Sequence, residues 1–143
     1  MPNEFLTVKL EKRSNSHILL DPPDVQIRLH ELSFLKDGWY DGRESAPSNE
    51  SLKELSSMFL DHYPKNASLP RIYPTLDGNV SVEWTIYNWE IGFEIELRSL
   101  FGIFIAVNLL TDEEIEKETN LKESTEWKNL VEIISSLNES IDE

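Results

Sequence analysis

The chain has no cysteine among its 143 residues, and histidine is scarce. The absence of cysteine excludes disulfide bonds, thiolate nucleophiles and zinc sites built on cysteine. The three histidines are His17, His30 and His62. None of them has a histidine or carboxylate partner at a recognised metal-ligand spacing, apart from directly adjacent acids. We therefore expect no metal site.

The sequence also lacks the common catalytic motifs. It contains no glycine-rich phosphate loop, no Gly-X-Ser-X-Gly elbow and no His-Glu-X-X-His pair. Glu83, Glu94 and Glu96 could form an acid–base pair of the kind that glycosidases use. Such a pair needs a cleft that raises one pKa, and we expect these residues on an open, solvated sheet face instead. The sequence thus predicts no catalytic residue, no cofactor and no enzymatic activity.

Long apolar runs are missing as well. No segment approaches the roughly 18 apolar residues of a membrane span. The first five residues, Met1–Phe5, do not show the basic region and apolar stretch of a secretory signal. The expected location is therefore the cytoplasm, without association with a membrane.

Acidic residues are the abundant class. The chain has 27 acids against 13 bases, a net charge of −14. Residues 111–143 contain 11 of these acids and three lysines, so this quarter carries a net charge of −8. An acidic surface repels nucleic-acid phosphates and anionic membranes and favours basic partners. Solubility alone would also explain the excess, and the sequence leaves this alternative open.

The length indicates one domain, residues 1–143. Its centre predicts an antiparallel meander of four strands near residues 70–75, 79–87, 90–98 and 102–110. The clearest turn signal is Asp77-Gly78, which is typical of a hairpin. Apolar and polar residues alternate along these strands, which predicts one buried face. The residues expected to be buried on that face are Val82, Trp84, Phe93, Ile95, Ile105 and Val107.

Three helices are expected beside this sheet. The first begins after Asp24, a helix-capping residue, and ends before Gly38. The second begins at Ser48 or Asn49 and ends before Pro64. The third covers about residues 125–137, with an apolar stripe that includes Trp127. The predicted fold class is α+β, with the helices packed on one face of a four-stranded antiparallel meander. Residues 1–24 are ambiguous between short strands and an extended arm.

The loop between the first two helices carries two aromatic residues. Trp39 and Tyr40 are followed by Asp41 within a segment bounded by Gly38 and Gly42. One interpretation is structural, with Trp39 filling the end of the sheet. The other is functional, because Trp, Tyr and Arg dominate the energetically important positions of protein interfaces.

Several short motifs in residues 32–97 occur together. They are Gly38-Trp39-Tyr40-Asp41-Gly42, Ala46-Pro47-Ser48, Leu69-Pro70, Pro74-Thr75, Asp77-Gly78 and Val82-Glu83-Trp84. The segment resembles a group of small bacterial proteins with a Gly-Trp-Asp-Gly loop followed by Pro-Thr-X-Asp-Gly and Glu-Trp motifs. The resemblance implies an accessory protein of mobile or defence-related loci and implies no catalytic residue. This chain departs from the pattern by the additional Tyr40.

These features favour a non-enzymatic, acidic binding protein that occludes a basic surface of a protein partner, as an antitoxin, immunity protein or anti-defence inhibitor does. The expected partner-binding residues are Trp39, Tyr40, Asp41, Glu113, Glu114, Glu116 and Glu118. A large apolar surface patch would favour a subunit of a larger bacterial defence or mobile-element assembly instead. A cleft that unites two of Asp41, Glu83 and Glu94 would favour a carboxylate-based hydrolase.

Overall fold

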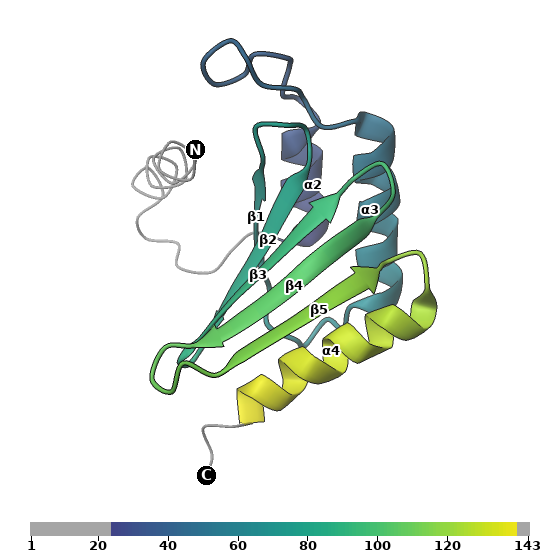
Figure 1. Ribbon diagram of the computed structural model, residues 1–143. Coiled ribbons are helices and arrows are strands. Elements are labelled where there is room, and N and C mark those ends of the chain that lie inside the picture. Colours follow the sequence, from purple (N-terminus) through teal and green to yellow (C-terminus); the bar gives the residue numbers. More distant parts are fainter. Residues whose placement is uncertain (1–23, 140–143) are drawn as a thin grey trace.

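The computed structural model describes residues 24–139, which form a layer of helices packed on one sheet (Figure 1). Helices α2 (Val25–Leu32) and α3 (Asn49–His62) lie behind the sheet in this view, and α4 (Ser124–Glu139) runs along its lower edge. The predictions for residues 1–23 lie outside the described part of the chain. The α+β class is confirmed.

The sheet has five strands, β1 (Arg71–Pro74), β2 (Val80–Ile86), β3 (Trp89–Glu96), β4 (Phe101–Asn108) and β5 (Glu114–Asn120). They lie in the order of the chain, and each neighbouring pair is antiparallel. The antiparallel meander is therefore confirmed, but the prediction of four strands was wrong. The sequence of β5 is Glu-Ile-Glu-Lys-Glu-Thr-Asn, with Ile115 as its one aliphatic residue. An edge strand is held largely by backbone hydrogen bonds, and charged side chains are typical of such edges.

The N-termini of α2 and α3 and the end of α3 follow the expected signals, but α2 ends at Leu32 with Ser33 as its C-cap, so the prediction that Gly38 ends this helix was wrong. The Asp24 carboxylate accepts a hydrogen bond from the Gln26 backbone N–H, and the Ser48 hydroxyl accepts one from Ser51. Each of these side chains satisfies a backbone donor that the first helical turn leaves unpaired. Helix α3 ends at His62, before Pro64, as predicted.

The core lies between the helices and the sheet. Its largest fully buried side chains include Trp84 from β2 and Trp127 from α4. The Trp127 ring meets the Phe59 ring edge-on, with centroids 5.0 Å apart, which packs α4 against α3. The predicted burial of Val82, Trp84, Phe93 and Ile95 is confirmed.

The predicted burial of Ile105 and Val107 was wrong by one residue of register. Strand β4 instead buries Gly102, Phe104 and Ala106 against the helices. The run from Phe101 to Val107 is apolar apart from Gly102, so alternation alone cannot decide which half faces inward.

The turn between β3 and β4 decides the register of β4. Its first and last residues, Leu97 and Leu100, are both buried, and the Leu100 N–H donates to the Glu96 carbonyl. Leu100 adopts a positive φ of 58°, a conformation that its burial in the core offsets. This turn pairs Ile95 with Gly102, so the alternate side chains of β4, from Phe101 to Val107, point away from the core.

Candidate functional site: the open face of the sheet

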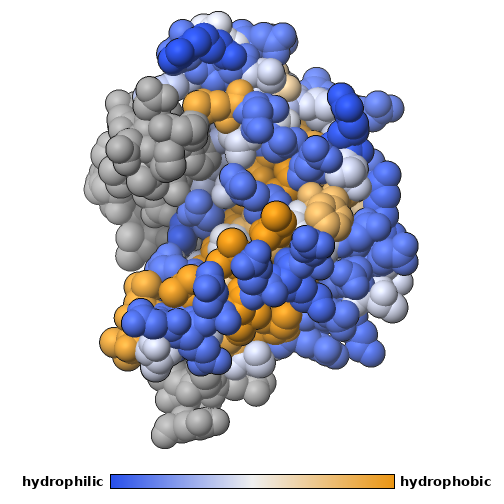
Figure 2. Space-filling view, in the orientation of Figure 1, coloured by the Kyte–Doolittle hydropathy of each residue, from blue (hydrophilic) through white to orange (hydrophobic). Residues whose placement is uncertain are grey.

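The face of the sheet opposite the helices carries an apolar line of side chains along β4. We call Phe101, Ile103, Ile105 and Val107 the β4 ridge. Phe101 and Ile103 are 39% and 41% exposed, which is high for side chains of this size. Beyond the end of the strand, Leu109 and Leu110 are exposed still further. Figure 2 shows apolar side chains gathered on this side of the molecule and bordered by hydrophilic ones.

Glutamates flank the β4 ridge on both sides. The strand register places Ile103 between Glu94 and Glu118. It places Val107 between Glu90 and Glu114 in the same way. The neighbouring strands thus form two acidic columns, Glu90, Glu94 and Glu96 on β3 and Glu114, Glu116 and Glu118 on β5. All six carboxylate side chains are exposed.

The acidic columns have no cationic partner within the described part of the chain. The salt bridges there join Arg28 to Glu31 and Arg43 to Asp41, away from the columns. Glu96 accepts a hydrogen bond from the Ser99 hydroxyl at 2.7 Å, and Glu90 accepts one from Thr85 at 3.3 Å. These bonds orient two of the carboxylates without neutralising their charge.

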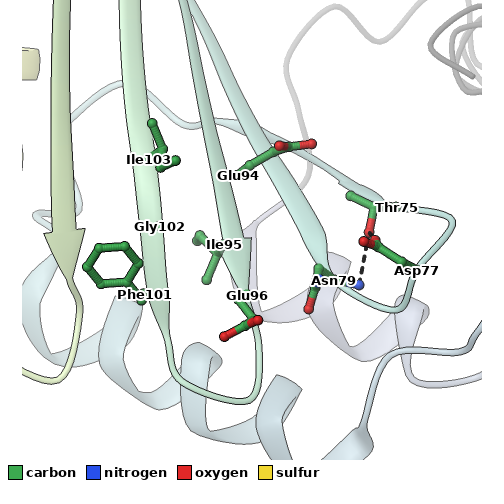
Figure 3. Close-up of a pocket in the computed structure, with 9 residues that line it drawn as sticks. All are labelled: Thr75, Asp77, Asn79, Glu94, Ile95, Glu96, Phe101, Gly102 and Ile103. Carbon is green, nitrogen blue, oxygen red and sulfur yellow. Dashed lines mark hydrogen bonds between the residues drawn. The ribbon is translucent and has the colours of Figure 1, made fainter.

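A hollow of about 250 Å³ lies at the Phe101 end of the β4 ridge (Figure 3). It is lined by Thr75, Asp77, Asn79, Glu94, Ile95, Glu96, Phe101, Gly102 and Ile103. The Thr75 hydroxyl accepts a hydrogen bond from the Asn79 N–H at 2.9 Å, which fixes the β1–β2 turn on one side of the hollow. With acids on that turn and on β3 and an apolar wall on β4, the hollow suits a cationic side chain with an aliphatic stem.

The carboxylates that line the hollow are those of Asp77, Glu94 and Glu96. Among residues 24–139, no group of three histidine, aspartate or glutamate side chains could hold a metal ion. The hollow brings Glu94 and Glu96 together but contains neither Asp41 nor Glu83, so it does not unite two of Asp41, Glu83 and Glu94.

The loop that carries Trp39, Tyr40 and Asp41 is folded around a buried carboxylate. Glu44 is 5% exposed and accepts hydrogen bonds from the backbone N–H groups of Tyr40 and Asp41 at 2.9 Å. Gly38 and Gly42 adopt φ values of 80° and 95°, which favour glycine. These contacts fix the conformation of the loop, although the loop does not pack into the hydrophobic core.

Side chains of the loop remain accessible. Trp39 is half-buried and lies outside the hydrophobic core, so the interpretation that it fills the end of the sheet was wrong. Its indole N–H donates to the Ser45 carbonyl at 3.3 Å. Tyr40 is 37% exposed. The hydrogen bond from Arg43, and to a smaller extent contact with Glu44, lowers the pKa of exposed Asp41 to about 2.

The structure places the predicted partner-binding residues in two regions. Glu114, Glu116 and Glu118 form the β5 column, and Glu113 is exposed just before that strand. The loop with Trp39 lies at the top of Figure 1, beyond the end of the sheet where β1 turns into β2. It is tied to the β1–β2 turn, because Ser45 bridges Asp77. The hollow includes residues of the same turn, so the loop borders the open face at that end.

The β4 ridge itself was missed by sequence reasoning, which assigned Ile105 and Val107 to the core. A signal was present, because a strand that is apolar on both faces is typically covered on both faces. In the comparisons with known proteins, no family model, curated protein or solved structure matches this chain. Within residues 24–139, no helix is long and apolar enough to cross a membrane.

Proposed function

We propose that this protein is a non-enzymatic binding protein that docks the open face of its sheet on a basic surface of a protein partner and thereby occludes that surface. The observation that carries the proposal is the β4 ridge between the two acidic columns. An apolar centre with a charged rim is the usual anatomy of a specific protein interface. Trp39 and Tyr40 would add aromatic contacts at the end of the face.

The two parts of this face would contribute differently to binding. Burial of the β4 ridge would supply most of the affinity, at roughly 25 cal/mol per Å² of apolar surface removed from water. The acidic columns would accelerate encounter with a cationic partner and reject partners of like charge. Six carboxylates on one face would also repel nucleic-acid phosphates, which argues against direct binding of DNA or RNA.

Inhibitors of the antitoxin, immunity or anti-defence type use this mode of action, because they block the functional surface of another protein. The β4 ridge also supports the alternative of a subunit in a larger assembly, since exposed apolar patches mark permanent contacts too. The two alternatives differ in salt dependence. An occluding inhibitor that relies on its acidic columns associates more slowly as salt rises, whereas a largely apolar assembly contact does not.

Affinity capture with matched baits tests the proposal. The full chain, the ridge variant Ile103→Thr/Ile105→Thr and the control variant Ile27→Gln/Leu60→Gln serve as baits in lysate of the cell that carries the gene. Threonine keeps the preference for a strand while it removes apolar surface. The control removes two other exposed apolar side chains, which lie on α2 and α3.

The expected result is one protein that is captured by the native chain and the control variant but lost with the ridge variant. That protein should have a basic surface, and its Kd for the native chain should rise with salt. A partner that binds the ridge variant as tightly as the native chain, with both baits folded by circular dichroism, would contradict the proposal.

A further inference from the structure

The open face also indicates which kind of structural element occupies it. Resting on the proposed function, we infer that the partner segment is a basic amphipathic α-helix that lies along β4. Its apolar stripe would cover the β4 ridge, and lysine or arginine residues on both flanks of the stripe would reach the two acidic columns.

The width of the face matches a helix. The acidic columns lie on strands two positions apart, so they are separated by about 9.5 Å, twice the strand spacing. An α-helix with its side chains is about 10–12 Å across. Residues beside its apolar stripe would therefore stand above the columns, and the long stems of lysine and arginine would let their charges reach the carboxylates.

An extended peptide fits this face less well. Strand β4 is paired along its whole length, with β3 on one side and β5 on the other. Its backbone therefore offers no hydrogen bonds to an added strand, which binds sheet edges instead. The open face presents side chains, and a helix is the element that satisfies its own backbone groups while it packs on them.

The length of the β4 ridge gives the length of the helix. From Phe101 to Val107 the strand spans about 20 Å at 3.4 Å per residue, and exposed Leu109 in the turn that follows extends the apolar surface further. At 1.5 Å per residue, a helix of about 14–18 residues covers this distance. The hollow at the Phe101 end, with Asp77, Glu94 and Glu96 in its lining, would receive one of the basic side chains.

A second copy of this chain is a poorer occupant. Each open face carries three glutamates on β3 and three on β5. Pairing two such faces would bring both sets of carboxylates together. Such juxtaposed like charges cost free energy unless counterions or cations intervene. The charge of the face therefore favours a cationic helix over self-association.

Peptides test the inference without the natural partner. The probes are a peptide of about 18 residues with leucines at helical spacing and lysines on both flanks, and a permuted peptide of the same composition without that spacing. A third peptide has glutamate in place of lysine. Binding to the native full chain, to Ile103→Thr/Ile105→Thr and to Ile27→Gln/Leu60→Gln is measured by calorimetry, and isoleucine methyl NMR locates the contact.

The amphipathic lysine peptide should bind at least about tenfold more tightly than the permuted peptide, become helical, and shift the methyl signals of Ile103 and Ile105. The ridge variant should lose this binding, whereas the Ile27→Gln/Leu60→Gln variant should retain it. The glutamate peptide should not bind the native chain. Equal affinity for the permuted peptide, or methyl shifts confined to other isoleucines, would overturn the helix. The inference would also be overturned if sedimentation velocity showed that the native chain alone forms a dimer and that the ridge variant does not.

These outcomes separate the two proposals. If the helix fails while capture of the natural partner still depends on Ile103 and Ile105, the docking face stands and its occupant is a different element. If capture of the partner ignores the β4 ridge, the proposed function fails, and with it the inference that rests on it.

Discussion

The ring of Phe93 lies over the α-carbon of Gly102 on the neighbouring strand, where no side chain could fit. A methyl group placed on Gly102 would come within 2.4 Å of Phe93 Cε1 and within 2.7 Å of the Glu94 carbonyl oxygen. Gly102 and Phe104 share the inner face of β4, and the Phe93 ring lies over Gly102 and meets the Phe104 ring edge-on, with centroids 6.1 Å apart. This packing supports the register that turns the β4 ridge outward.

Replacing Gly102 with alanine should destabilise the protein by about 1–3 kcal/mol, since either the Phe93 ring or the backbone must move. Urea unfolding at equilibrium would measure the loss. Gly92→Ala is the matched control, because a methyl group there meets no atom within 4 Å and the change should be neutral or slightly stabilising. Equal midpoints for Gly102→Ala and the native chain would mean that the ring does not occupy this space.

The register shows how far sequence patterns carry and where they stop. Strands β2 and β3 alternate strictly between apolar and polar residues, so Trp84 and Phe93 could be placed in the core from the sequence. Strand β4 is apolar on both faces, and its orientation depends on the turn at Leu97–Leu100 and on the space above Gly102, which no local pattern encodes. The acidic residues could be recognised from the sequence. The β4 ridge between the acidic columns could not, because its position depends on the register of β4.

Trp84 should be among the most sensitive positions of the core. It is 1% exposed, and its indole N–H donates to the Tyr63 hydroxyl at 3.0 Å and to the Ser68 carbonyl at 3.1 Å. Trp84→Ala should cost about 3–5 kcal/mol through the lost contacts and the cavity. Tyr63→Phe should cost only about 1–2 kcal/mol, because it removes the hydrogen bonds of the hydroxyl with Trp84 and the Ser68 carbonyl while that carbonyl still accepts the indole N–H. Thermal and urea unfolding would rank the two variants, and equal losses would contradict this account.

Tyr63 should also make stability depend on pH in the alkaline range. Burial raises the pKa of its phenol to about 12, although the hydrogen bond from Trp84 opposes the shift. Since the unfolded value is about 10, the contribution of Tyr63 to stability is fully present below pH 10 and is lost as pH rises toward 12. An absorbance titration of phenolate should show a late step that Tyr63→Phe removes. A native titration that is complete near pH 10 would place this phenol in solvent.

The aromatic loop and the acidic columns should affect different rate constants of partner binding. Trp39→Ala or Tyr40→Ala should raise the off-rate, because aromatic contacts at an interface hold the formed complex. Neither change should reduce stability by more than about 1 kcal/mol, since both side chains lie outside the core. Surface plasmon resonance with the captured partner would separate the rates. An unchanged off-rate for both variants would remove the loop from the interface and leave the open face alone.

The acidic columns should act on the on-rate. Replacing Glu114, Glu116 and Glu118 with glutamine should slow association with a basic partner, while the fold remains intact because exposed charges contribute little stability. The control is Glu54→Gln/Asp61→Asn/Glu132→Gln, which removes the same charge from the helices. Raising salt from about 50 to about 500 mM shortens the Debye length from about 14 to about 4 Å and should diminish the difference between the two variants. If both slow association equally at low salt, net charge alone accounts for the effect. In that case the arrangement of carboxylates beside the β4 ridge contributes nothing specific to encounter.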